Sequence, residues 1–258
     1  MTSRRERFRN IRHYAVYYGY GEAERLERFD AVVVEPKGQS GDDVKRLQAV
    51  GTLAMAYVSA TELPRHDPNH RLLKEEDFLR LDGRRASNET FGTDIASLRS
   101  KRWLGLLHHQ VGSLLLRDGY DGIFLDTIGN VEWDRWPPSE AEEEIRAAAA
   151  FVGELRRLFP DRILIQNNGV TRLYRETGAA LDAVCWENPP LDNRDVRPWL
   201  ERAAAELKDA SARDNFTVWL LMSDPSEGAR GDRSSGEAFA AQNHFLLYHA
   251  PPHYLSID

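Results

Sequence analysis

Two short apolar segments that each end in an acidic residue carry the clearest chemical signal in the sequence. Gly122–Asp126 follows a glycine-containing turn, and Ala183–Glu187 ends 61 positions after it. Because side chains alternate between the two faces of a strand, an inward Asp126 would share its face with Phe124. Two strands that end in inward acids predict paired-carboxylate chemistry, in which one carboxyl group attacks or activates water and the other transfers a proton.

The elements that would position these acids alternate between strands and helices along the chain. The expected strands are short and apolar: Tyr14–Tyr18, Ala31–Glu35, Leu53–Ser59, Gly122–Asp126, Arg162–Asn167, Ala183–Glu187, Phe216–Met222 and His253–Ile257. The expected helices are Asp42–Val50, Leu98–Arg117, Ser139–Leu158, Arg197–Ala210 and Ser235–Tyr248, although Phe245–Ala250 also fits a strand. Apolar strands alternating with helices are typical of a parallel sheet covered by helices. Eight strands favour an α/β fold of the (β/α)8 TIM barrel type over a doubly wound sheet.

The chain has 258 residues, a length typical of one barrel, so we expect a single domain over residues 1–258. Residues 61–97 interrupt the alternation after the third strand, because they are polar, highly charged and rich in turn residues. At that place the segment would lie on the face where the strands end, which is where barrels carry their function. It either forms one wall of a cleft or is a flexible surface insertion.

Other polar and aromatic residues at or after the expected strand ends are predicted to bind substrate. They are Tyr17, Glu35, Lys37, Tyr57, Glu62, Asn167, Asn168, Trp186, Asp224 and Tyr254. Aromatic rings stack on sugar rings, and amides and acids bind hydroxyl groups, so this set fits a carbohydrate site. Structural readings compete with it: Tyr17 and Tyr18 cannot both face inward, the Asn-Asn-Gly turn tolerates left-handed backbone, and a strand-end acid can cap a helix or join a salt bridge.

The overall charge is acidic, with 34 Lys and Arg against 41 Asp and Glu and a formal net charge of −7. This balance argues against a nucleic-acid partner and suits a neutral or cationic ligand, although it also serves solubility. No apolar run reaches the roughly 20 residues that span a bilayer, so no membrane span is expected. The basic N-terminus is not followed by an apolar stretch, so the sequence alone indicates a cytoplasmic protein.

Neither a metal nor a cofactor is expected. Cys185 is the only cysteine, which excludes a disulfide within the chain and a cysteine zinc cluster. We expect it to be a small core residue. His66 and His70, like His249 and His253, have helical spacing, but the intervening prolines prevent a helical metal pair. The chain contains no Gly-x-Ser-x-Gly elbow, phosphate loop or dinucleotide fingerprint after a strand.

The order of short motifs along the chain resembles the endo-α-1,4-polygalactosaminidase family (family 114-type glycoside hydrolases) and the related hydrolase domains of bacterial exopolysaccharide operons. The most specific match is Trp103 and a long helix followed by Gly119–Ile128, which reads Gly-Tyr-Asp-Gly-Ile-Phe-Leu-Asp-Thr-Ile. Weaker matches occur in the right order, at Tyr17-Tyr18-Gly19, Ala56–Ser59 with Glu62, Ile165–Gly169 and Trp186-Glu187. The resemblance extends over nearly the whole chain.

This resemblance implies a (β/α)8 barrel that cleaves α-1,4 links in polymers of galactosamine and N-acetylgalactosamine. It implies Asp126 as the nucleophile, Glu187 as the general acid/base and an extracytoplasmic location. A negatively charged cleft would suit a partly de-acetylated, cationic polysaccharide as the partner. Two other functions stay open at this point: a non-catalytic carbohydrate-binding barrel, and a barrel enzyme of another class that would need a metal cluster or a basic catalytic residue such as Lys37.

Overall fold

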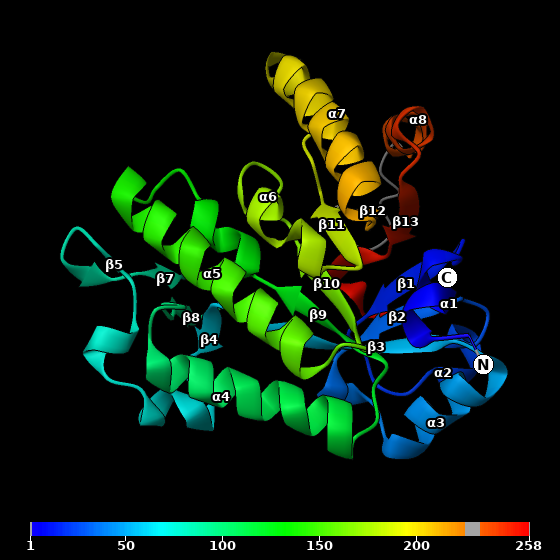
Figure 1. Ribbon diagram of the computed structural model, residues 1–258, viewed down its shortest axis with the longest axis horizontal. Coiled ribbons are helices and arrows are strands. Elements are labelled where there is room, and N and C mark those ends of the chain that lie inside the picture. The colour runs from blue at the N-terminus through cyan, green and yellow to red at the C-terminus, as the bar shows by residue number, and fades with distance from the viewer. Residues whose placement is uncertain (1, 225–232, 258) are drawn as a thin grey trace.

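The computed structural model describes residues 2–224 and 233–257, and eight parallel strands form one curved sheet within them (Figure 1). In hydrogen-bonded order the strands are β1 (Tyr14–Tyr17), β2 (Ala31–Val34), β3 (Leu53–Ser59), β9 (Gly122–Asp126), β10 (Ile163–Asn167), β11 (Ala183–Glu187), β12 (Thr217–Ser223) and β13 (Leu246–Ala250). The last strand lies against the first, so the sheet curls into a nearly closed barrel. The (β/α)8 TIM barrel predicted from the sequence is therefore confirmed.

Helices connect the strands and cover the outside of the barrel. They are α1 (Arg4–Arg9), α2 (Ala23–Leu26), α3 (Gly41–Val50), α4 (Lys101–Gly112), α5 (Pro138–Leu158), α6 (Leu173–Thr177), α7 (Arg197–Asp214) and α8 (Ser234–Asn243). Figure 1 shows α4 and α5 side by side on one flank, where the rings of His108 and Phe151 meet edge to face. Within the described part of the chain, none of these helices has the length and apolar character needed to cross a membrane.

The alternation of side chains along the strands divides the core into two layers. The layer inside the barrel includes Phe124, Cys185 and Trp219, and the layer between sheet and helices includes residues such as Leu125 and Val184. Phe124 and Cys185 thus lie on the inner face, as predicted for strands that end in inward acids. Gly122 is the first residue of β9 and lies on this face. A side chain would not fit there, because a Cβ would lie 2.3 Å from the carbonyl oxygen of Ile163.

The segment between β3 and α4 folds into small sheets rather than a plain loop. The antiparallel strands β4 (Glu62–Pro64), β8 (Thr93–Ile95) and β7 (Ser87–Asn88) form one sheet, and β5 (Arg80–Leu81) pairs with β6 (Arg84–Arg85). The buried Asp94 accepts hydrogen bonds from Arg65 and Arg85 and contacts His70. Ile95 packs in a separate apolar cluster with Trp136. The insertion therefore has its own packed interior and its own ion-pair centre.

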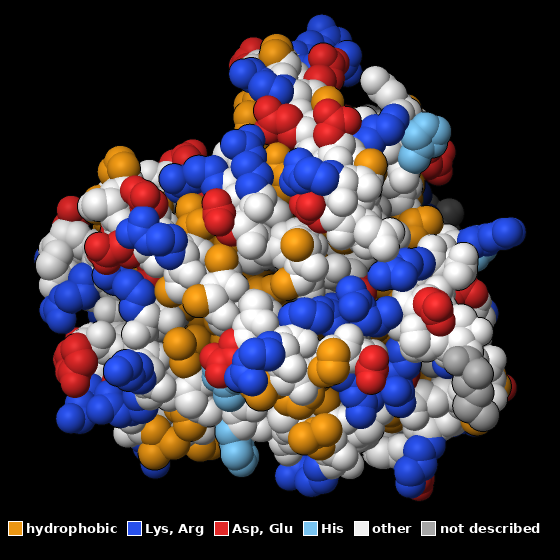
Figure 2. Space-filling view, viewed as in Figure 1, with side chains coloured by type: hydrophobic (Ala, Val, Ile, Leu, Met, Phe, Trp, Pro, Cys, Tyr) orange, Lys and Arg blue, Asp and Glu red, His pale blue; other side chains and the backbone are white. Residues whose placement is uncertain are grey.

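Helix α1 closes the end of the barrel opposite the carboxyl ends of the strands. Phe8 is fully buried and its ring lies 5.4 Å from that of Trp219 inside the barrel. Arg4 binds Asp121, and Arg5 binds Asp182. Figure 2 shows basic side chains gathered on the surface near this helix, while acidic and basic side chains alternate elsewhere on the same face.

The C-terminal region differs from the sequence prediction. The predicted helix Ser235–Tyr248 ends at Asn243, because His244 adopts a left-handed conformation with φ of 59°. The eighth strand is Leu246–Ala250, which pairs with β12 in parallel register. His253–Ile257 forms no strand, and Tyr254 instead belongs to a short 3-10 turn after β13.

Candidate active site

The carboxyl ends of the strands surround a large cavity of about 1230 Å³. Asp126 at the end of β9 and Glu187 at the end of β11 both line it, and Asn167 lines it from the end of β10. Because β10 lies between β9 and β11 in the sheet, Asn167 stands between the two acids. Three consecutive strands thus each deliver one polar side chain to the same point.

A continuous chain of hydrogen bonds joins these three side chains to two tyrosines. Asn167 Nδ2 donates to Asp126 Oδ1 and to Glu187 Oε2, at 2.6 Å in both cases. Tyr57 donates to the other oxygen of Asp126 at 2.9 Å, and Tyr254 donates to the other oxygen of Glu187. Both oxygens of each carboxylate are therefore held by the protein, so their positions are fixed before any ligand binds.

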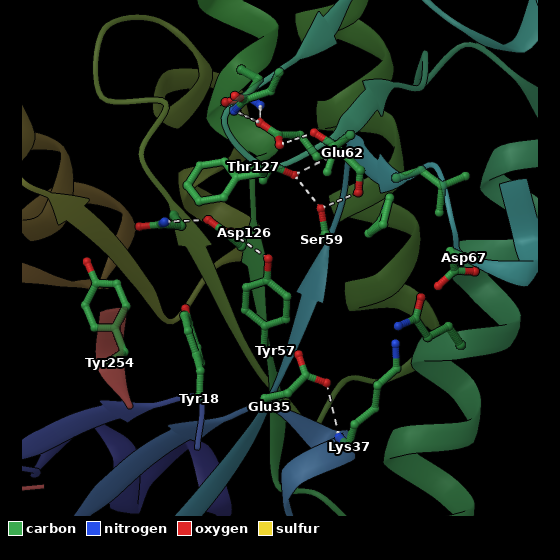
Figure 3. A pocket seen from close by; sticks show the side chains of 18 of the residues that line it. Tyr18, Glu35, Lys37, Tyr57, Ser59, Glu62, Asp67, Asp126, Thr127 and Tyr254 are labelled. Atoms are coloured by element: carbon green, nitrogen blue, oxygen red, sulfur yellow. Dashed lines mark hydrogen bonds between the residues drawn. The ribbon is translucent and has the colours of Figure 1, made fainter. Parts of the chain in front are cut away.

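Three tyrosine rings form the wall beneath the acids. Tyr18 lies between Tyr57 and Tyr254, with ring centroids 4.9 and 5.2 Å away and nearly edge-to-face geometry. Figure 3 shows the three hydroxyl groups pointing the same way, toward the level of Asp126. Burial, and then the nearby negative charge of Asp126, raises the pKa of both Tyr18 and Tyr57 well above the usual value. Tyr18 and Tyr57 consequently stay neutral, and the hydroxyl groups of Tyr57 and Tyr254 act as hydrogen-bond donors to the acids.

Burial raises the pKa of both acids. For Asp126, the loss of hydration is the largest cause, opposed by the hydrogen bonds from Asn167 and Tyr57. For Glu187, burial is again the largest cause, followed by repulsion from the charge of Asp126. Raised pKa values favour a state in which one of the two carboxyl groups is protonated while the other is ionised, as an acid–base pair needs.

Glu62 is a third buried carboxylate on the cavity wall, with 8% of its surface exposed. It accepts hydrogen bonds from Asn88 at 3.1 Å, Thr93 at 2.6 Å and Asn130 at 3.0 Å. All three donors are neutral, so they orient the carboxylate without cancelling its charge. Two of them come from the insertion, which therefore reaches the site and walls it, one of the two roles predicted for residues 61–97.

Each of the strands β9, β10 and β11 is followed by a residue with left-handed backbone. Thr127, Asn168 and Asn188 have φ values of 58°, 57° and 47°. Asn168 Oδ1 accepts from the backbone N–H of Glu187 at 3.0 Å, and Thr127 Oγ1 accepts from two backbone N–H groups at the start of the insertion. A positive φ is unfavourable for a β-branched residue such as Thr127, so these bonds hold strained backbone at the site.

The cavity extends beyond the acids, and its charged lining is mainly acidic; we call this wider part of the cavity the groove. The carboxylates that line it are Glu35, Glu62, Asp67, Asp118, Asp126, Glu187 and Asp224, against the cations Lys37 and Arg117. Arg117 is itself bound to Asp118. Phe91, which is 71% exposed, and Trp133 line the groove on the side of the insertion. The groove offers aromatic faces and a negative potential to a ligand longer than one sugar ring.

Most of the residues predicted from the sequence line this one cavity. They are Glu35, Lys37, Tyr57, Glu62, Asp126, Asn167, Asn168, Glu187, Asp224 and Tyr254. Tyr17 and Trp186 do not. Tyr17 points to the outer layer and donates to the carbonyl of Tyr20, and Tyr18 takes the inward position. Trp186 packs between Trp199 and Phe239 outside the sheet.

Several residues of the site were not predicted. Asn130 and Thr93 bind Glu62 from segments far away in sequence, and no local pattern marks them. Tyr18 could have been found if it had been known which alternate residues of the first strand face into the barrel. Among residues 2–224 and 233–257, no group of three or more His, Cys, Asp or Glu is placed to hold a metal ion.

Comparison with known proteins identifies the family. The model of glycoside-hydrolase family GH114 matches residues 4–188. The glycoside hydrolase domain of PelA from Pseudomonas aeruginosa has a similar structure, with a TM-score of 0.77 at 22% identity, covering 96% of this chain and 98% of that one. Ega3 from Aspergillus fumigatus, solved in complex with galactosamine, gives a TM-score of 0.68 at 11% identity, covering 93% and 91%.

The α-galactosidase of Thermus thermophilus is more distant, with a TM-score of 0.59 at 15% identity, covering 98% of this chain and 66% of that one. At such identities the structural matches establish the shared barrel. A search of curated proteins gives no match. The family match extends over more than half of the chain and includes β9, β10 and β11 with their polar ends. The chain therefore belongs to glycoside-hydrolase family GH114 and is a glycoside hydrolase.

Proposed function

We propose that this hydrolase cleaves α-1,4 links inside polymers of galactosamine and N-acetylgalactosamine, with Asp126 as nucleophile and Glu187 as general acid/base. The observation that carries the proposal is the single nitrogen of Asn167 that contacts both acids. Each acid oxygen lies 2.6 Å from it, so the two oxygens are at most twice that distance apart, about 5.2 Å. This limit lies below the roughly 6.5–9.5 Å separation of the carboxyl groups in inverting glycoside hydrolases and is compatible with the about 5–5.5 Å of retaining ones.

The reaction then proceeds in two displacements. Asp126 attacks the anomeric carbon while Glu187 gives its proton to the leaving glycosidic oxygen, which breaks the link and forms a covalent glycosyl ester. Glu187, now ionised, removes a proton from water, and the water oxygen attacks the same carbon and releases Asp126. The raised pKa of Glu187 favours the protonated form that the first step requires.

This mechanism predicts retention of configuration at the anomeric carbon. The first product released from an α-linked oligomer should be the α-anomer, which then mutarotates. Proton NMR of the anomeric signals during the first minutes of hydrolysis tests this. Initial release of the β-anomer would mean inversion, which needs room for a water between the acids and carboxyl groups roughly 6.5–9.5 Å apart.

The choice of sugar is supported by the charge of the groove and by the relatives. The solved structure of Ega3 holds galactosamine, which is the class of sugar that we propose here. The acidic lining of the groove suits a polymer whose free amino groups carry positive charge. The cavity volume of about 1230 Å³ leaves room for more than one sugar ring, which fits attack within a chain rather than only at its end.

Glu62 is the residue that we expect to distinguish free amines from N-acetyl groups. Its charge is not cancelled by its neutral donors, and an ammonium group would cancel it. Glu62→Gln should lower kcat/KM on a de-acetylated polymer about 10- to 100-fold, the range for a hydrogen bond to a charged group. On a fully N-acetylated polymer the loss should be clearly smaller.

Thr93→Val is the matched control for Glu62, because it removes one donor to this carboxylate and leaves the charge in place. It should affect both polymers about equally. If Glu62→Gln also lowered kcat/KM equally on both polymers, the role of Glu62 would be to anchor the insertion rather than to recognise the free amine.

The proposed function is tested directly by incubating the protein with a partly de-acetylated α-1,4-galactosamine polymer. We expect release of a ladder of short oligomers, measured by mass spectrometry and by new reducing ends. Release of monosaccharide alone would contradict cleavage within the chain. Absence of products from folded protein, with hydrolysis of a different α-linked polysaccharide, would contradict the substrate.

A further inference from the structure

The side chain of Asn167 uses both of its amide hydrogens on the two acids of the site. Nδ2 lies 2.6 Å from Asp126 Oδ1 and 2.6 Å from Glu187 Oε2. We propose that Asn167 is a positioning residue that sets the spacing of the two carboxyl groups and prevents them from sharing one proton directly. This inference rests on the proposed function, in which these two groups carry out the reaction.

The orientation of the amide is determined by its neighbours. An amide oxygen in the place of Nδ2 would face two carboxylate oxygens, all of them acceptors, so only the –NH2 group fits there. The two hydrogens of an –NH2 group diverge, and each points to one acid. The strand order places Asn167 on β10 between β9 and β11, from where one short side chain reaches both acids.

This geometry leaves Asn167 little capacity to bind a sugar itself. Both N–H groups are occupied, and Oδ1 is buried without a hydrogen-bond partner among the described residues. Only 2% of the residue is exposed. An unpartnered buried carbonyl oxygen is unfavourable for folding, so the amide contributes to the site at some cost in stability.

The consequence for proton chemistry follows from the fact that an –NH2 group donates and does not accept. Two buried carboxyl groups in direct contact share one proton, and one of them is then very hard to ionise. With Asn167 between them, a proton cannot lie on the side of Glu187 that faces Asp126. It is left to the side where Tyr254 contacts Glu187 Oε1. Asp126 can then be ionised while Glu187 is protonated.

Other titratable groups also face the pair and remain in any variant of Asn167. They are Tyr14 on β1, Tyr18 directly after β1, Tyr57 on β3, Glu62 on β4, Cys185 on β11 and Tyr254 after β13. The five of these that are tyrosine or cysteine have raised pKa values, because burial disfavours their charged forms. They stay neutral through the pH range in which the acids titrate, and the assigned carboxyl titrations described below distinguish Asp126 and Glu187 from the carboxyl group of Glu62.

The test compares wild type with Asn167→Leu, which keeps the branching at Cγ and removes both donors. Without the donors, the charged forms of both acids lose stabilisation and both pKa values rise. We expect kcat to fall about 10- to 100-fold at the optimum, the effect of hydrogen bonds to charged groups. Both limbs of the pH profile of kcat/KM should move to higher pH.

Gln166→Leu is the matched control on the same strand. Gln166 faces the outer layer, where it accepts from Thr177 and donates to the carbonyl of Asn168. Its replacement removes a buried amide of similar size without touching the acids. The limbs of its pH profile should stay in place, even if its thermal stability falls.

A second readout does not depend on activity. Carbon-13 NMR of the labelled carboxyl groups, with Asp126→Asn and Glu187→Gln used for assignment, gives both titrations in the substrate-free protein. In Asn167→Leu we expect both to occur at higher pH and to be more widely separated. Suppose that wild type is active and Asp126→Asn is inactive. If Asn167→Leu then shows unchanged carboxyl titrations and an unchanged pH profile of kcat/KM, the role of Asn167 is overturned and the proposed function is not. An inactive wild type would overturn the proposed function, and the NMR titrations would still decide the inference.

Discussion

Replacing Asp126 by Asn should abolish hydrolysis of the galactosamine polymer, with kcat lowered by about 10³-fold or more. The variant removes the nucleophile, and losses of at least this size are usual when the attacking group of a covalent mechanism is lost. Glu187→Ala should lower kcat about 10²- to 10⁴-fold, the contribution of general acid–base catalysis. Initial rates of reducing-end release at saturating polymer measure both.

The roles of the two acids can be separated by azide. Glu187→Ala leaves space beside the anomeric carbon, so azide can attack the glycosyl ester and give an α-glycosyl azide with increased turnover. Asp126→Asn should not be rescued in this way. Rescue of an Asp126 variant with retained configuration, or of Glu187→Ala with inverted configuration, would exchange the two roles.

Glu35→Gln provides the matched control, because Glu35 lines the same cavity and, among the residues that the structure describes, its side chain bonds only to the backbone N–H of Lys37. It removes one negative charge at the rim of the site without touching the chain of hydrogen bonds around Asn167. We expect at most a tenfold change in kcat/KM. A loss in Glu35→Gln as large as that in Asp126→Asn would mean that the assignment of the acids is wrong.

Phe8→Ala should destabilise the fold by about 3–5 kcal/mol, the usual cost of emptying the place of a buried phenylalanine. Phe8 has no exposed surface and packs against Trp219, which is stacked on Tyr14 at 3.9 Å. For a protein of this size each kcal/mol lowers Tm by roughly 2–4 °C, so a decrease of about 6–20 °C is expected. Urea unfolding followed by circular dichroism measures the free energy.

Phe91→Ala is the control for this prediction, since it makes the same chemical change at a side chain that is 71% exposed. It should change the free energy of unfolding by less than about 0.5 kcal/mol. If the two variants lost equal stability, α1 would not form part of the barrel core.

The alternation of side chains explains why so much of the site could be predicted from the sequence. In Gly122–Asp126 and Ala183–Glu187, the alternation puts each final acid on the same face as Phe124 or Cys185, and in the structure this face is the inner one. The same rule excludes Trp186 from the face of Glu187, because adjacent residues point to opposite sides. For Tyr17 and Tyr18, parity gives two equal choices, and only packing against the rest of the barrel decides between them.

Contacts between distant segments could not be predicted in this way. Tyr254 was expected on a strand, but it reaches Glu187 from a turn after β13. The shift follows from the left-handed His244, which ends α8 early and allows Leu246–Ala250 to become the last strand. Similarly, two of the three donors to Glu62 come from the insertion, which also holds the ion-pair centre at Asp94.

The contacts of α1 have a consequence for how this barrel is altered by engineering. Arg4 forms a salt bridge with Asp121, directly before β9, and Arg5 forms one with Asp182, directly before β11. These are the strands whose far ends carry Asp126 and Glu187. One short helix thus anchors the amino ends of the same two strands whose carboxyl ends carry the acids. Trimming the chain from its N-terminus should therefore disturb the alignment of the acids as well as the stability of the core, and expression boundaries that keep α1 intact should preserve both.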